Sequence, residues 1–205
     1  RARVNLKNIR EGFLLDRDFA KIVNASSRLS SSPLFIDDTS NMSILELRAK
    51  ARRMVQRHGI KLFVIDYLQL LHSSSERSKE SRQQEIAEIS RGIKALAKEL
   101  NVPVIVLSQL NREIEKEKNR KPRLSDLRES GAIEQDADFV GLLYQPGKKE
   151  EEGEDDSSNQ AVPINLYVAK QRNGPTGEVN LIFLKEFTRF ENLSKIASED
   201  VPVNT

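Results

Sequence analysis

The chain has 205 residues, of which 38% are hydrophobic and 31% charged, a composition typical of a globular domain with a sizeable core. It contains no Cys and only two His, which excludes a disulfide framework, thiol catalysis and a His-based metal cluster among these residues. Lys and Arg number 33 against 31 Asp and Glu, so the net charge of +2 does not by itself indicate a nucleic-acid binder and any basic surface must be local. No apolar run approaches the ~18–20 residues that cross a bilayer and no signal peptide is visible, so we expect a cytoplasmic protein without a membrane partner.

The first part of the chain predicts a helix followed by a short strand. Asp16 is expected to cap a helix with one apolar side, and the Ser-Ser-Ser-Pro run at 30–33 is expected to end it. The apolar residues 34–36 predict a short buried strand. Asp37 and Asp38 follow, and we interpret them as turn and cap residues in preference to a metal pair.

A second helix has recognisable signals at both ends. Ser43 and Glu46 form the S-x-x-E pattern of a capping box, and Gly59 is suited to end the helix. A strand is predicted at 61–66 directly afterwards. With the strand at 34–36, this order predicts a β-α-β unit.

The apolar run at 62–65 leads without interruption into Asp66. Such a run predicts a strand of a parallel sheet that is buried on both faces. An acid at the carboxyl end of this kind of strand lies where α/β sheets place their ligands, and in P-loop nucleotidases it holds Mg²⁺. The alternative is a solvated turn residue.

A second strand with the same kind of ending follows a long helix. Residues 84–100 carry apolar side chains at alternating steps of three and four, which predicts an amphipathic helix. Residues 102–107 predict a second buried strand, and Ser108 and Gln109 come directly after it. Two polar strand ends in one series favour a phosphate site at a common edge.

The rest of the chain predicts strands and polar connections. Residues 139–144 predict a third core strand, while 164–169 and 178–184 predict an antiparallel pair. Residues 148–160 are acidic and of low complexity, and the tail 194–205 is polar and expected to be loose.

Four motifs and the chain's ending together resemble the bacterial replicative DNA helicase of the DnaB type, encoded by a bacterium or a phage. The match covers nearly the whole chain in the right order. The similar segments are FVIDYLQL at 63–70, IVLSQLNR at 105–112, SDLRESGAIEQDAD at 125–138, AKQRNGPTG at 169–177 and TRFENL at 188–193.

The resemblance implies an α/β fold, a RecA-like and mostly parallel sheet flanked by helices with a C-terminal antiparallel hairpin. It would occupy residues 1–193, followed by the tail at 194–205. It also implies a homo-hexameric ring with ATP and Mg²⁺ between subunits, which moves along single-stranded DNA and separates duplex at the replication fork. Primase and a helicase loader are the implied partners of the full-length protein.

The resemblance assigns catalytic roles to four residues. Asp66 would be the acid associated with Mg²⁺, and Gln109 the sensor of the γ-phosphate. Lys170 and Arg172 would reach the neighbouring subunit's γ-phosphate, where added positive charge stabilises the transferring phosphoryl group. Without the family context, the last two would simply be basic residues at a hairpin end.

The resemblance also implies a DNA-contacting loop formed by Arg128, Glu129 and Gly131. An Arg side chain and backbone N–H groups bind phosphate without reading sequence, which suits an enzyme that moves along any strand. Glycine at 131 would free the backbone for close approach or for a turn. The alternative for Arg128 and Glu129 is a surface ion pair. The basic segment 112–123 is expected near the same channel, although mixed charge makes a solvated loop the default.

The chain lacks one signature that the family requires. No stretch reads G-x-x-x-x-G-K-[ST], and residues 141–149 have the wrong spacing for it. We expect the phosphate loop to precede Arg1, so the 205 residues alone should hydrolyse ATP negligibly. Two alternatives stay open: a recombinase or KaiC-type ATPase of the same fold, and a non-catalytic or regulatory RecA-like ring module.

Overall fold

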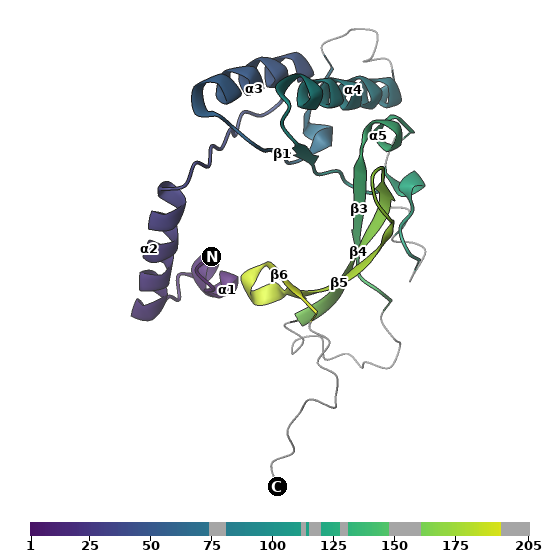
Figure 1. The fold of residues 1–205 in the computed structure, drawn as a ribbon. Helices are drawn as coiled ribbons and strands as arrows, with labels where there is room; N and C mark the ends of the chain where they lie inside the picture. Colours follow the sequence, from purple (N-terminus) through teal and green to yellow (C-terminus); the bar gives the residue numbers. More distant parts are fainter. Residues whose placement is uncertain (74–80, 112–113, 115–119, 128–130, 148–160, 194–205) are drawn as a thin grey trace. The chain divides into compact units, whose positions relative to one another are not determined.

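The computed structural model describes residues 1–73, 81–111, 114, 120–127, 131–147 and 161–193 (Figure 1). The predicted acidic segment at 148–160 and the tail at 194–205 lie outside these residues. The chain divides into two compact units. One comprises Arg1–Ile36, Leu143–Tyr167 and Glu178–Thr205, and the other comprises Asp37–Leu142 and Val168–Gly177. Within the described parts, every helix is too short or too polar to cross a membrane.

The second unit is built on a parallel pair of strands. β1 (Phe63–Ile65) and β2 (Val104–Val106) run parallel, with Ile65 opposite Val106. The chain crosses between them through α4 (Arg82–Leu100), so this segment is a β-α-β unit. α3 (Ile44–His58) lies beside α4 in Figure 1, and the short helix α5 (Gly131–Asp136) also contacts α4.

The core of this unit lies between the two long helices and one face of the strand pair. The predicted apolar stripe of α4 supplies its centre, where Ile86 and Ile89 are almost fully buried. Burying side chains of this size stabilises the fold by about 1.5–3 kcal/mol each. The other buried members of the cluster are Met42, Ile44, Leu68, Leu71 and Ile93, with Ile65, Val104 and Val106 packed against them.

Gly92 permits α3 and α4 to approach closely. A Cβ at this position would lie 2.4 Å from Cγ1 of Ile44, which is itself buried at the start of α3. A larger residue would therefore force the helices apart.

The prediction that β1 and β2 are buried on both faces is wrong. Val64 and its cross-strand partner Ile105 are 60% and 50% exposed, whereas Ile65 and Val106 face the core. The helices cover one face of the pair, and among the described residues nothing covers the other.

The ends of α3 confirm the predicted signals. The Ser43 hydroxyl accepts from the Glu46 backbone N–H at 3.2 Å, and the Glu46 carboxylate accepts from the Ser43 backbone N–H at 2.9 Å. Gly59 ends the helix with a φ of +62°, a conformation that favours glycine.

The predicted strand at 34–36 is wrong, and so is the β-α-β unit that began there. These residues form no strand, and Ile36 is 84% exposed. An apolar triplet becomes a strand only where a neighbouring strand can pair with it. Asp37 has the predicted turn role: its carboxylate accepts from the Thr39 backbone N–H at 3.1 Å and pairs with Lys50 at 2.8 Å.

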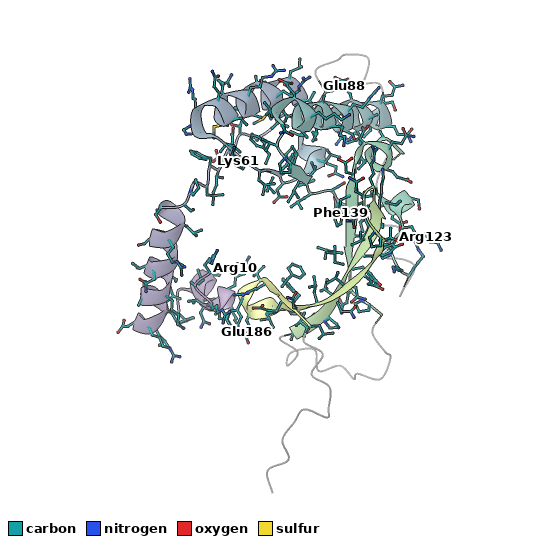
Figure 2. The ribbon with its side chains drawn as sticks, viewed as in Figure 1. Arg10, Lys61, Glu88, Arg123, Phe139 and Glu186 are labelled. Atoms are coloured by element: carbon teal, nitrogen blue, oxygen red, sulfur yellow. The ribbon has the colours of Figure 1, made fainter. Side chains whose placement is uncertain are left out.

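The first unit contains two helices. α1 (Leu6–Glu11) lies against the 3₁₀ turn Lys185–Phe187, and Figure 2 labels Arg10 and Glu186 on these two segments. α2 (Asp16–Ser30) begins at Asp16, so the prediction that Asp16 caps it is wrong. Leu15 occupies the cap position and makes no side-chain bond, while Asp16 in the first turn complements the helix dipole.

The C-terminal strands form one sheet in the order β3-β4-β5-β6. They are β3 (Phe139–Tyr144), β4 (Ala161–Gln171), β5 (Gly177–Leu184) and β6 (Arg189–Asn192). β5 and β6 are antiparallel, with Phe183 opposite Phe190. Residues 139–144 were predicted as a third core strand, but the alternating exposure of β3, with Phe139 half exposed (Figure 2), and its pairing place it in this second sheet.

Glu99 joins α4 to α3, and its protonation provides the first testable prediction. Its carboxylate bonds to Arg52 and Arg48, the latter at 2.9 Å, and these side chains lower its pKa from 4.5 to about 2. A lowered pKa means that the stabilisation is present above pH 4.5 and is lost as the pH falls towards 2. Glu99→Gln should therefore lower the urea midpoint at pH 7, and the difference from wild type should vanish near pH 2.

The measurement combines urea unfolding at several pH values with an NMR titration of the Glu99 carboxyl carbon. Glu11→Gln is the control, since Glu11 approaches Lys7 only at 4.0 Å on the surface of α1. A Glu99 titration midpoint near 4.5 would contradict the bonding described here.

Candidate functional site

Asp66 and Gln109 follow the ends of two neighbouring parallel strands. Because β1 and β2 are parallel and Ile65 lies opposite Val106, both residues leave the sheet at the same edge. Backbone bonds join the two exits: Leu107 N–H donates to the Ile65 carbonyl, and Leu68 N–H donates to the Leu107 carbonyl, each at 2.9 Å. The edge is therefore one continuous hydrogen-bonded structure.

Gln69 connects the polar residues at this edge. Its amide Nε2 donates to Ser108 Oγ at 3.0 Å, and its Oε1 accepts from the Gln109 backbone N–H at 3.5 Å. Its own carbonyl accepts from Arg82 at 3.1 Å. The sequence contained no signal for this role, because the bonds join residues far apart in the chain.

The Asp66 carboxylate is exposed and makes no hydrogen bond or ion pair with any described residue. No group of three or more Asp, Glu or His side chains that could hold a metal occurs in the described ranges. Mg²⁺ commonly takes only one or two protein carboxylates and completes its octahedron with water and substrate phosphates. A single free carboxylate at a sheet edge therefore fits that ion.

Lys170 and Arg172 lie at the end of β4, and both contact the C-terminal end of α5. The Lys170 ammonium donates to the Glu134 carbonyl and, at 3.4 Å, to the Gln135 carbonyl. The Arg172 guanidinium donates to the Gln135 carbonyl. These carbonyls lie in the last turn of the helix, where a cation is favourable.

Asp138, two residues beyond α5, connects the same cations to α4. Its carboxylate accepts from Lys94 and lies 3.5 Å from Arg172 Nε. The Lys94 hydrogen bond is the main reason that the pKa of Asp138 is lowered, so the carboxylate is ionised at neutral pH. The Arg172 backbone N–H also donates to the Asp138 carbonyl at 2.9 Å.

Gly131 is the first residue of α5, whereas Arg128 and Glu129 lie outside the described residues. Its φ is not in the left-handed region, and a Cβ there would meet no atom within 4 Å. Neither a turn nor internal packing therefore requires glycine at 131.

The described part of the basic segment 112–123 is bound within the chain. Arg120 forms a two-pronged pair with Asp126 at 2.8 and 3.0 Å, and it is the largest cause of the lowered pKa of Asp126. The Asn111 backbone N–H donates to the Asp126 carbonyl at 2.8 Å, which closes the base of the loop.

The chain matches the DnaB-like helicase C terminal domain over residues 1–192. It belongs to this family. The match includes every described residue of both groups, Asp66 with Gln109 and the cluster around α5. The expected RecA-like α/β fold agrees with the structure in its helix-flanked parallel pair and its C-terminal antiparallel strands.

Two relatives illustrate the similarity. The chain is 48% identical over 192 residues to the replicative DNA helicase DnaB of Geobacillus stearothermophilus, and 47% identical to the replicative DNA helicase DnaC of Bacillus subtilis. Each alignment covers 94% of this chain and 41% of the relative. The chain thus spans about two fifths of the length of these helicases.

Two solved structures have the same fold. One is a DnaB-like replicative helicase studied for its interactions with primase, with a TM-score of 0.81 and 36% identity over 94% of this chain and 45% of that one. The other is an ATPase domain solved separately, with a TM-score of 0.80 and 36% identity over 94% of this chain and 67% of that one.

Proposed function

We propose that this DnaB-like chain is part of the motor of a replicative DNA helicase, which couples ATP hydrolysis to movement along single-stranded DNA and to unwinding at the replication fork. The observation that carries the proposal is the common edge of β1 and β2, where Asp66 and Gln109 lie in a chain that matches the helicase family over residues 1–192. A ring of six copies, with nucleotide between neighbours, is part of the proposal, as is a cytoplasmic location.

Asp66 and Gln109 would form this chain's side of the nucleotide site. Asp66 would hold Mg²⁺ through water, and bound Mg²⁺ would neutralise charge on the phosphate oxygens of ATP. Gln109 would contact the γ-phosphate with its amide, and Gln69 fixes the backbone from which that amide projects. A polar group at this position can detect whether the γ-phosphate is present, because the phosphate provides acceptors that vanish on its release.

Lys170 and Arg172 would serve the site of the neighbouring copy. Their positive charge would stabilise the transferring phosphoryl group, so hydrolysis would require assembly of the ring. Their position just before a turn supports this role, because side chains at the end of a strand can project beyond their own subunit.

DNA binding is assigned to Arg128, Glu129 and Gly131, and the partners to primase and a helicase loader. A relative of known structure interacts with primase, which supports that partner for the full-length protein. Contacts from Arg128 and from the backbone at 129 and 131 would go to phosphates, in keeping with movement along any sequence.

Unwinding by the full-length protein tests the proposal. It should separate a forked duplex when ATP and Mg²⁺ are present, and single-stranded DNA should stimulate its ATP hydrolysis. A non-hydrolysable ATP analogue should support DNA binding without unwinding. Nucleotide binding with neither hydrolysis nor unwinding would overturn the proposal in favour of a non-catalytic ring module.

Gly131→Ala separates a DNA role from a folding role. Because a Cβ meets nothing within 4 Å, the variant should be as stable as wild type or more stable, since Ala favours helix by up to about 1 kcal/mol. If DNA approaches this backbone closely, affinity for single-stranded DNA should fall by about tenfold or more. Fluorescence anisotropy and thermal melting measure the two effects.

Gly177→Ala is the matched control, because a Cβ there also meets nothing and its φ is not in the left-handed region. It should leave DNA affinity unchanged. Unchanged affinity in Gly131→Ala as well would contradict close approach of DNA at this position.

A further inference from the structure

The contacts at the C-terminal end of α5 do more than complete a helix. The last carbonyls of a helix lack intrahelical partners, and here the Glu134 and Gln135 carbonyls accept from Lys170 and Arg172. The chain thus places both proposed trans-acting cations on one short helix. That helix begins at Gly131, the last residue of the proposed DNA loop.

The Arg172 guanidinium is held along one edge. Nε lies 3.5 Å from Asp138 Oδ1 and Nη2 donates to the Gln135 carbonyl, whereas Nη1 has no partner among the residues that the structure describes. The guanidinium group is planar, so two contacts on one edge determine the direction of the remaining donors. Nη1 is therefore directed by Asp138 and α5 together.

Asp138 is itself fixed from two sides. Lys94 of α4 donates to Oδ2, and the Asp138 carbonyl accepts from the Arg172 backbone N–H at 2.9 Å. Its carboxylate therefore transmits the position of α4 and α5 to a side chain on the hairpin, although the Asp138 side chain is 63% exposed and the pair adds little stability.

We infer that Asp138 is a positioning residue that orients Arg172 for the neighbouring copy's phosphate and ties this cation to the helix that follows the DNA loop. The inference rests on the proposed function. Movement of the DNA loop would shift α5, and through the Gln135 carbonyl and Asp138 it would redirect the guanidinium. DNA binding and ATP hydrolysis would thus be coupled within one copy.

Asp138→Asn in the full-length protein tests the inference, because the amide keeps the shape and removes the charge that orients Nε. With saturating single-stranded DNA, kcat for ATP hydrolysis should fall about tenfold, as expected when a reacting group is misaligned. KM for ATP, affinity for a fluorescent ATP analogue and the thermal midpoint should stay at wild-type values. Asp138→Glu, which restores the charge, should recover most of kcat.

Asp37→Asn is the matched control, since Asp37 is also an exposed carboxylate paired with a Lys. It should keep the wild-type kcat. A wild-type kcat in Asp138→Asn would overturn the inference, as would a loss that Asp138→Glu shares in full. A lowered thermal midpoint with unchanged kcat would show that Asp138 only stabilises the fold.

A double-mutant cycle with Arg172→Lys shows whether Asp138 acts through Arg172. Lysine cannot offer the two-donor edge, so Asp138→Asn should cost little further kcat in that background. Full additivity would overturn the inference. The proposed function fails separately: if Arg172→Ala leaves hydrolysis intact, the trans role is lost, whereas a defect in Arg172→Ala with a wild-type Asp138→Asn removes only the positioning role.

Discussion

Replacing Arg172 with Ala in the full-length protein is expected to reduce ATP hydrolysis by about 10³-fold or more, the effect that an arginine supplied to a transferring phosphoryl group has on turnover. The physical reason is that no other group of the copy bearing Arg172, apart from Lys170, is proposed to reach the neighbour's γ-phosphate. Nucleotide binding should be spared, because the charge acts mainly on the transition state. Phosphate release and binding of a fluorescent ATP analogue measure the two quantities.

Arg52→Ala is the control for this variant. Arg52 is 51% exposed and paired with Glu99, and Arg172 is 49% exposed and paired with Asp138, so the two changes remove similar surface interactions. Arg52→Ala should retain hydrolysis. Mixing Arg172→Ala subunits with Asp66→Asn subunits should restore some activity, because a ring would then contain interfaces with both functional residues. Retained hydrolysis in Arg172→Ala alone would count against the trans role.

Asp66→Asn is expected to raise the Mg²⁺ concentration that gives half-maximal ATP hydrolysis by ~10–100-fold, the usual effect of removing a group that holds a metal through its outer shell. The carboxylate has no partner in the described structure, so the substitution should leave the thermal midpoint unchanged. The measurement is a Mg²⁺ titration of ATP hydrolysis, with Mg²⁺-dependent nucleotide binding as a second readout.

Asp38→Asn provides the comparison, since Asp38 is likewise exposed and makes no bond to a described residue. It should keep the wild-type Mg²⁺ dependence. If Asp66→Asn has the same Mg²⁺ dependence as Asp38→Asn, the assignment of Asp66 to the metal is wrong.

Local signals in the sequence predicted the helices of the second unit well. The capping box at Ser43 and the glycine at 59 act within one helical turn, so the residues that cause these ends are adjacent to them. The apolar spacing of α4 likewise predicts which side chains are buried, and Ile86, Ile89 and Ile93 are all in the core. The common edge of Asp66 and Gln109 was also predictable, because parallel strands end on the same side of a sheet.

Strand predictions failed where they depended on a partner. Residues 34–36 have the composition of a buried strand, but no strand pairs with them, and Ile36 is exposed. Val64 and Ile105 are apolar without being covered in the described structure, because hydrophobicity shows which residues favour burial and not what covers them.

The sequence by itself determined the family, the helix limits in α3 and α4, and the residue types available for phosphate chemistry. Only the tertiary structure decided which of these residues meet. Gln69 joins Ser108, and Asp138 joins Lys94 and Arg172, across long stretches of chain. Such contacts depend on how β1, β2, α4 and α5 pack, and packing is a property of the whole fold that no local pattern of residues contains.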